Sequence, residues 1–272
     1  MTEPMAESKT EPGSADVDGR VVIITGGTRG IGRGAALHLA KLGSALVVTG
    51  RKPERLEEIG GELDALGAPH LELAINTADR DGAFEMVART IDRFGRVDGL
   101  VANAQTFRPV TPLEDVTEAD MDLLLDTGLK GTLWGMQAVF PHMRDQGWGR
   151  IVTMGSAAGY LGAAGYGPYA TSKEGIRALT RVAAREWAKH GIVVNCVNPA
   201  SVGHRAPPAD DPSPEGQARR AVFDAMYKDH PMGRDGDAEV DIGPVVAFLL
   251  SDACRYLTGE TFMVDGGGLM RP

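Results

Sequence analysis

Residues 20–32 read Arg-Val-Val-Ile-Ile-Thr-Gly-Gly-Thr-Arg-Gly-Ile-Gly, and this stretch gives the strongest indication of the fold. The apolar run 20–25 predicts a buried strand that leads directly into Gly26, Gly30 and Gly32, in a G-x-x-x-G-x-G spacing. Glycines let the backbone turn tightly and approach a pyrophosphate, and the N-terminus of a following helix offers free N–H groups. The stretch therefore predicts a phosphate-binding turn, although a glycine-rich turn without a ligand is the alternative. The candidate phosphate-binding residues are Gly26, Thr28, Arg29, Gly30, Ile31 and Gly32.

Strand and helix patterns alternate along the rest of the chain. Short apolar runs predict further strands, and a 3.6-residue spacing of apolar side chains predicts helices between them. Strands separated by helices form a parallel sheet that is covered on both faces. We therefore expect an α/β fold with a doubly wound parallel sheet of about seven strands. The further strands are expected at 45–49, 70–75, 97–102, 150–154, 192–197 and 261–264, and the helices at 34–42, 53–66, 83–94, 117–143 (interrupted near Gly128 and Gly131), 170–190 and 240–250.

The composition limits the class of protein. The chain has 272 residues, of which 43% are apolar and 24% are charged, as is typical of a globular domain. The net charge of −9 has the wrong sign for a protein that neutralises nucleic-acid phosphates, and no apolar run approaches the ~20 residues of a membrane span. Two cysteines exclude a disulfide scaffold and fit a reducing cytoplasm, and the six histidines show no metal-ligand spacing. We therefore expect a cytoplasmic protein with no metal and no nucleic-acid or membrane partner.

Gly50, Arg51 and Lys52 follow the second expected strand, where a dinucleotide site carries the group that selects its cofactor. An Asp or Glu at this place would hydrogen-bond the ribose 2′-hydroxyl of NAD and would repel a 2′-phosphate. The guanidinium of Arg51 can instead bind a phosphate through two parallel hydrogen bonds, and Arg29 is a second candidate for this contact. The sequence therefore favours NADP(H) over NAD(H), unless Arg51 and Lys52 are only solvated loop charges.

Tyr169 and Lys173 lie four residues apart in Tyr-Ala-Thr-Ser-Lys, so they share one face of the expected helix. A tyrosine has a reference pKa near ~10, and a nearby ammonium group favours its phenolate form. Ser156 follows the fifth strand, and its hydroxyl could hold a substrate oxygen while Tyr169 supplies or removes a proton. The three residues are therefore a candidate catalytic set, although chance Tyr–Lys pairs at this spacing are common.

Taken together, these motifs resemble those of the short-chain dehydrogenases/reductases, from about residue 20 to residue 267. Further motifs of the resemblance are Asn103-Ala104, Asn198-Pro199, Thr258-Gly259 and Val264-Asp265-Gly266-Gly267. The resemblance implies a Rossmann-like fold and reversible hydride transfer between a nicotinamide and a carbonyl or alcohol. By analogy with the family, it also implies a homotetramer.

The resemblance further implies a role for each site residue. Tyr169 would be the acid/base, Lys173 would bind the nicotinamide ribose and lower the pKa of Tyr169, and Ser156 would orient the substrate oxygen. Asn76 and Thr77 would lie at the adenine. Pro199 and Val202 would lie near the nicotinamide. The other cofactor-binding residues that the resemblance implies are Asn103, Ala104, Tyr169 and Lys173.

Four positions depart from the family pattern. Gln105 replaces a glycine after the fourth strand, Ala200 replaces the glycine of a Pro-Gly turn, and His204 aligns with a threonine. Gly128 aligns with an asparagine that supports a water-mediated proton relay, so the chain lacks that amide side chain. We expect Gln105 and His204 to face the substrate. The candidate substrate-binding residues are Gln105, Tyr160, Tyr166 and His204, with packing an equal alternative for the two tyrosines.

The chain is expected to form one dinucleotide-binding and catalytic domain over residues 19–272. Residues 1–18 are polar and acidic and lack the apolar segment of a signal peptide, so they are expected to be a disordered tail. Residues 201–232 are expected to form a substrate lid, because they begin with a long stretch rich in Pro, Asp and Ala.

Three functions remain open from the sequence. The first is an NADP(H)-dependent oxidoreductase that acts on a free ketone or secondary alcohol. The second is a 3-oxoacyl-thioester reductase, which the acidic residues of the stretch 201–215 disfavour because an acyl carrier would want a basic patch. The third is a dinucleotide-binding sensor or partner protein with little turnover, which Gly128 and Gln105 suggest and the intact Ser156–Tyr169–Lys173 set opposes.

Overall fold

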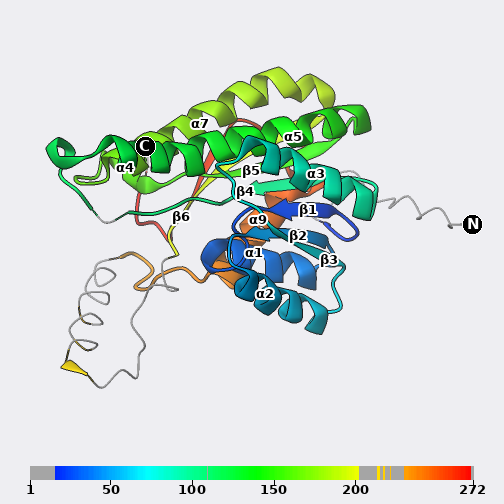
Figure 1. The fold of residues 1–272 in the computed structure, drawn as a ribbon, viewed down its shortest axis with the longest axis horizontal. Helices are drawn as coiled ribbons and strands as arrows, with labels where there is room; N and C mark the ends of the chain where they lie inside the picture. Colours follow the sequence, from blue (N-terminus) through cyan, green and yellow to red (C-terminus); the bar gives the residue numbers. More distant parts are fainter. Residues whose placement is uncertain are drawn as a thin grey trace, which may run out of the picture.

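The fold is built on one parallel β-sheet. A computed structural model describes residues 16–108, 110–201, 213–214, 217, 221 and 230–270. The strand order is β3-β2-β1-β4-β5-β6-β7, and every neighbouring pair is parallel. The doubly wound parallel sheet that the sequence predicts is therefore confirmed (Figure 1). The strands are β1 (Val21–Ile24), β2 (Ala45–Gly50), β3 (His70–Ala74), β4 (Gly99–Ala102), β5 (Gly149–Met154), β6 (Ile192–Pro199) and β7 (Thr261–Val264).

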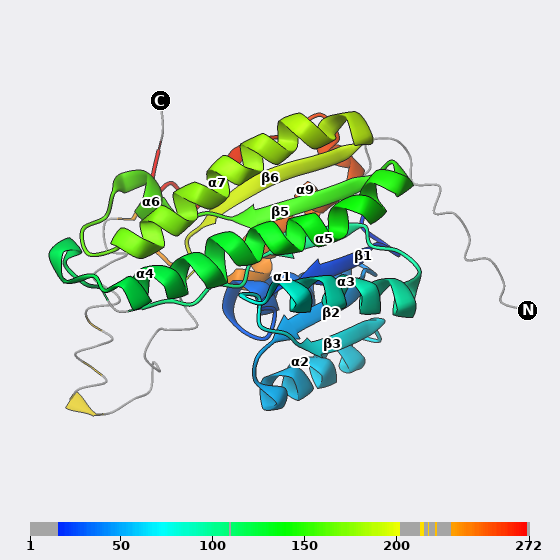
Figure 2. The same ribbon diagram turned by 45° about the horizontal axis from the view of Figure 1, so that its top comes forward.

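Helices cover both faces of this sheet (Figure 2). One face is covered by α1 (Gly30–Lys41), α2 (Pro53–Ala65) and α9 (Gly243–Leu250). The other face is covered by α3 (Arg80–Phe94), α5 (Gly131–Gln146) and α7 (Gly167–Trp187). Val22 and Ile24 of β1 pack toward the first group and Ile23 packs toward the second, because successive side chains of a strand point to opposite faces.

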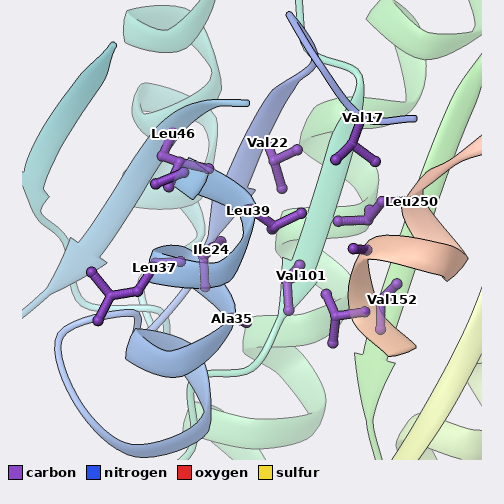
Figure 3. Packing of buried hydrophobic residues seen from close by; sticks show 14 of the residues in the cluster. Val17, Val22, Ile24, Ala35, Leu37, Leu39, Leu46, Val101, Val152 and Leu250 are labelled. Carbon is purple, nitrogen blue, oxygen red and sulfur yellow. The ribbon is translucent and has the colours of Figure 1, made fainter. Parts of the chain in front are cut away.

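The core on the α1 side includes a residue from the segment that precedes β1 (Figure 3). Ile24 and Leu46 of the sheet and Leu39 of α1 are all completely buried in it. Val17 belongs to the same cluster and is only 1% exposed. The expected tail over residues 1–18 is therefore too long at its C-terminal end, because Val17 covers apolar surface of this core. Residues 1–15 lie outside the described part of the chain.

The helical pattern expected over residues 117–143 is continuous, but its hydrogen bonding changes in the middle. α4 (Glu118–Leu124) leads into the π-helical segment η2 (Leu125–Lys130), which leads into α5. The interruption expected near Gly128 is therefore a π-helical turn, a feature that is frequent at functional sites. The remaining helical segments are η1 (Leu113–Asp115), α6 (Ala157–Leu161), η3 (Ala188–His190), η5 (Ala238–Ile242) and η6 (Asp252–Cys254).

β1 and β4 lie side by side although they are not consecutive in the sequence. The chain leaves β1 toward α1 on one face of the sheet and leaves β4 toward α5 on the other. Such a reversal opens a crevice at the carboxyl ends of the strands, and ligands of doubly wound sheets bind there. Across the described residues, no helix combines the length and the apolar character that crossing a bilayer requires.

Candidate active site

A cleft of about 560 Å³ lies at the carboxyl ends of the central strands, where the strand order reverses. Its volume is within the ~300–1,000 Å³ that is usual for small-molecule sites. Residues that the sequence places in separate motifs meet in it. The predicted residues that line the cleft are Gly26, Thr28, Arg29, Gly30, Ile31, Arg51, Asn76, Thr77, Asn103, Ala104, Gln105, Ser156, Tyr169, Lys173 and Pro199.

The turn between β1 and α1 packs closely against the end of β4. Gly26 has a φ of +66°, which glycine adopts without strain, and a Cβ at Gly26 would lie 2.9 Å from the Cα of Ala104. Asn103 Nδ2 donates hydrogen bonds to the carbonyl oxygens of Thr25 at 2.9 Å and Gly26 at 3.1 Å. Gly32 lies beneath the turn and outside the cleft lining, where a Cβ would be 2.6 Å from Asn103 Nδ2. Gly32 therefore permits this packing, while the turn itself faces the cleft.

The β2 side of the cleft is positively charged. Arg29, Arg51, Lys52 and Arg55 line it, and none of the described lining residues is an aspartate or a glutamate. In a chain with a net charge of −9 this is a local excess of positive charge, and it favours an anionic ligand. Arg55, which lies in the first turn of α2, is not among the residues predicted from the sequence. The signal for it was present, because Arg55 follows Arg51 and Lys52 within one short stretch.

The β5 side of the cleft carries the predicted catalytic set. Ser156 is the N-cap of α6, and its Oγ accepts a hydrogen bond from the backbone N of Ala158 at 3.2 Å. Its O–H can therefore donate to another group. Lys173 is 4% exposed, and its Nζ donates to the carbonyl oxygen of Met154 at 2.8 Å. The same Nζ lies 5.5 Å from the ring centroid of Tyr169, so the ammonium group is held near the phenol.

Comparisons with known proteins identify the family of the chain. A family model described as enoyl-(acyl carrier protein) reductase matches residues 26–268. A 12α-hydroxysteroid dehydrogenase from Clostridium sp. is 38% identical over 262 residues, which cover 94% of this chain and 98% of the relative. The chain belongs to the short-chain dehydrogenase/reductase family.

Other members of the short-chain dehydrogenase/reductase family are similar over the same length. The 3-oxoacyl-[acyl-carrier-protein] reductase of Staphylococcus epidermidis is 36% identical over 252 residues, which cover 91% of this chain and 98% of the relative. The crystal structure of NAD⁺-bound xylitol dehydrogenase superposes with a TM-score of 0.83 at 29% identity, covering 92% of this chain and 99% of that chain. The protein is therefore an oxidoreductase of a family that binds a nicotinamide dinucleotide, and the Rossmann-like fold implied by the sequence motifs is confirmed.

The predicted substrate contacts of this short-chain dehydrogenase/reductase are only partly gathered at the cleft. Gln105 lines it, and the ring of Tyr166 lies beside it, 6.2 Å from the ring of Tyr169. Tyr160 is outside the lining and 43% exposed, and its ring lies 5.4 Å from the guanidinium carbon of Arg177. Val202, His204 and most of the expected lid over residues 201–232 lie outside the described residues.

The two cysteines of this family member are both buried free thiols. Burial raises the pKa of the Cys196 thiol above its ordinary value, and burial does the same for Cys254. Both side chains are therefore held as neutral thiols, which are poor nucleophiles. Within the described residues, no group of three or more His, Cys, Asp or Glu side chains is arranged to hold a metal ion.

Gly50 ends β2 in the position where a carboxylate would bind the ribose of NAD, and its surroundings constrain substitution. A Cβ at Gly50 would lie 2.6 Å from the Cγ2 of Thr28. We expect Gly50→Asp alone to lower the free energy of unfolding by about 1–3 kcal/mol, because the site is overpacked. Thr28→Ser removes the methyl group, so the double variant should recover stability and prefer NADH. Thermal unfolding and dissociation constants for both cofactors check this, and a fully stable single variant would contradict it.

Proposed function

We propose that this protein transfers a hydride between NADP(H) and a ketone or secondary alcohol. The observation that carries the proposal is the composition of one cleft. Its β2 side has basic side chains and, among the described lining residues, no carboxylate, while its β5 side has Ser156, Tyr169 and Lys173. The first feature suits a cofactor with an extra phosphate, and the second suits proton transfer to a carbonyl oxygen.

The residues of the cleft fit a bound NADP(H). The close approach of the turn at Gly26 to Ala104 and the N-terminus of α1 suit a pyrophosphate, because they offer backbone N–H groups and no bulky side chain. The residues that would hold the rest of the cofactor are Arg29, Arg51 and Arg55 for the 2′-phosphate, Asn76 and Thr77 for the adenine, Lys173 for the nicotinamide ribose and Pro199 beside the nicotinamide. When bound, the reduced cofactor supplies a hydride to the carbonyl carbon.

Side chains of the cleft then bind and protonate the carbonyl oxygen. Ser156 donates a hydrogen bond to it, since the Ser156 Oγ already accepts one from Ala158 and keeps its O–H for the substrate. Tyr169 gives its phenolic proton to the same oxygen as the carbon is reduced. The ammonium group of Lys173, which is buried and fixed on Met154, stabilises the phenolate that this step leaves on Tyr169. In the oxidising direction, the phenolate takes the proton from the alcohol.

Lys173 has two proposed tasks, so its removal should have two effects. We expect Lys173→Ala to weaken NADPH binding roughly 10-fold or more, because a hydrogen bond from a charged group contributes ~1.5–3 kcal/mol. We also expect kcat to fall by at least the same factor, because the phenolate of Tyr169 loses its ammonium neighbour. The measurements are the dissociation constant for NADPH and kcat at saturating cofactor. Lys189→Ala is the matched control, because Lys189 is exposed at the end of the same helical stretch. A Lys173→Ala variant with normal kcat would refute the proposed role.

The rim beside Tyr169 favours an apolar ketone as the substrate. Phe107 lies edge-on to the ring of Tyr169 at 5.7 Å. Val110 and Leu113 are 56% and 75% exposed, and their side chains lie against Gly165 and Gly167, shortly before Tyr169 in the chain. Exposed apolar side chains gathered next to a catalytic group suit a water-insoluble substrate. Arg108 is the described basic residue of this rim, and it already faces Asp120 at 3.5 Å, so it offers little to an acidic carrier protein. The similarity to a hydroxysteroid dehydrogenase supports the same class of substrate.

The substrate class is tested by a panel of carbonyl compounds with NADPH. We expect kcat/KM to be higher for alicyclic ketones, from a substituted cyclohexanone to a steroid ketone, than for 3-oxoacyl thioesters. A clear preference for the thioesters would support the alternative, a 3-oxoacyl-thioester reductase, which the similarity to an acyl-carrier-protein reductase favours.

A further inference from the structure

Gly128 lies in the π-helical segment η2, and it is buried against the loop that follows β4. A Cβ at Gly128 would lie 2.5 Å from both the Nε2 and the Oε1 of Gln105, and it would also collide with the Oγ of Ser172. The carboxamide of Gln105 therefore occupies the space in which a side chain at position 128 would have to begin. The two departures from the family pattern, a longer residue at 105 and a missing side chain at 128, are thus in contact with each other.

Two hydrogen bonds fix the orientation of the Gln105 carboxamide. Its Nε2 donates to the carbonyl oxygen of Leu124 at 3.3 Å and to the Oγ of Ser172 at 3.2 Å. The atom that faces Leu124 must be the NH₂ group, because a backbone carbonyl can only accept. Leu124 is the last residue of α4, and Ser172 is a completely buried residue of α7. One side chain therefore connects the loop after β4, the start of the π-helical segment and α7.

The residue that Gln105 contacts on α7 lies within the catalytic helix face. Ser172 directly precedes Lys173 and is three residues after Tyr169, so a shift of Ser172 moves both catalytic side chains. The loop is attached a second time, because Thr106 N donates to Thr127 Oγ1 at 3.2 Å. The Gln105 side chain is thus well placed to set the distance between η2 and the part of α7 that carries Tyr169 and Lys173.

The carbonyl end of the same carboxamide is an unused acceptor. Gln105 Oε1 is buried and has no hydrogen-bond partner among the described residues, although Gln105 belongs to the cleft lining. Buried carbonyl oxygens are nearly always paired, so this atom is suited to accept a hydrogen bond from a donor that enters the cleft.

We propose that Gln105 is a positioning residue, which supplies from the end of β4 the carboxamide that Gly128 lacks. Its NH₂ group holds α7 against η2 through Ser172 and Leu124, and its Oε1 accepts a hydrogen bond from a donor in the cleft beside Lys173. The inference rests on the proposed function, because the groups that Gln105 positions are the proposed acid/base and its ammonium neighbour. The identities of residues 105 and 128 should therefore depend on each other.

The expected effects follow from this dependence. Gln105→Met keeps the length of the side chain and removes the amide, so we expect kcat to fall roughly 10- to 100-fold while the affinity for NADPH is kept. The pH at which kcat changes should also shift, because the surroundings of Tyr169 and Lys173 change. The Gly128→Asn variant should have a lower kcat and a lower melting temperature than the wild type, since the new side chain collides with Gln105 and Ser172. The exchanged variant, Gln105→Gly with Gly128→Asn, should recover most of both losses.

The experiment measures kcat, its pH profile, the NADPH dissociation constant and the melting temperature for these variants. Gly135→Ala is the control for a buried helical glycine, because its Cβ would lie an ordinary 3.6 Å from Leu100. A Gln105→Met variant with the wild-type kcat and pH profile, or an exchanged variant no better than Gly128→Asn, overturns the positioning role alone. If the wild type reduces no ketone, or if Tyr169→Phe keeps its activity, the proposed function fails and the positioning role fails with it.

Discussion

Replacing Tyr169 with phenylalanine should lower kcat by roughly 10²–10⁴-fold, because the variant keeps the ring and loses the proposed acid/base. The ring makes edge contacts with Phe107 at 5.7 Å and with Tyr166 at 6.2 Å, and a phenylalanine can keep both. The fold and the affinity for NADPH should therefore be almost unchanged. The measurement is kcat at saturating NADPH and ketone, together with the dissociation constant for NADPH.

Tyr256→Phe is the control for this substitution. It removes a phenol from a residue that is 98% exposed and outside the cleft lining. If both variants lose activity equally, the loss does not come from proton transfer at Tyr169. A Tyr169→Phe enzyme that keeps more than half of the wild-type kcat on a good substrate would show that another group serves as the acid/base.

NADPH should bind roughly 10- to 150-fold more tightly than NADH. The 2′-phosphate carries about −1.5 to −2 charge at pH 7 if it behaves like other phosphomonoesters. Arg51 can bind it through two hydrogen bonds, with Arg29 and Arg55 nearby, and we take ~1.5–3 kcal/mol in total because the site is open to solvent. A difference of ~1.4 kcal/mol is a factor of ten, which gives the stated range. Arg51→Ala should lose most of the preference by weakening NADPH and not by improving NADH.

The preference is measured as dissociation constants for both cofactors at two ionic strengths. Higher salt should weaken the binding of NADPH more than that of NADH, because the extra contact is electrostatic and partly exposed. Arg89→Ala controls for the change in net charge, since Arg89 is exposed on α3 and outside the cleft. Equal affinities in the wild type, or an Arg51→Ala variant that still prefers NADPH tenfold, would contradict this account of cofactor choice.

The fold was predictable because its signals are local. The apolar run before Gly26 predicts a buried strand, and the glycine spacing predicts the turn into α1, so the sheet and its crevice follow from the alternation of elements. The π-helical segment was not predictable as such, because six residues inside a longer helical pattern are too few to show an apolar periodicity of their own. The expected tail ran too far for a similar reason, since a single valine at position 17 carries no periodicity.

The residues of the candidate site that belong to sequence motifs were predictable. Residues whose role depends on contacts with distant parts of the chain were not. Arg55 follows Arg51 and Lys52 within one short stretch, but it was missed because a charge at the start of a helix normally faces solvent, whereas here it lines the cleft with Arg51. Gln105 and Gly128 were each noticed as a departure, but nothing in the sequence places them together. Their contact arises because the loop after β4 packs on η2, which is a property of the tertiary structure.

Transfer of a labelled hydride is the measurement that separates a reductase from a protein that only binds a dinucleotide. The purified protein is incubated with NADPH that carries deuterium on the transferred position of the nicotinamide, and with an alicyclic ketone. Mass spectrometry of the product should show one deuterium on the carbinol carbon with wild type, and almost none with Tyr169→Phe in the same time. Tight binding of NADPH without deuterium in any alcohol, across a ketone and thioester panel, would contradict the account and leave a dinucleotide-binding sensor as the better description.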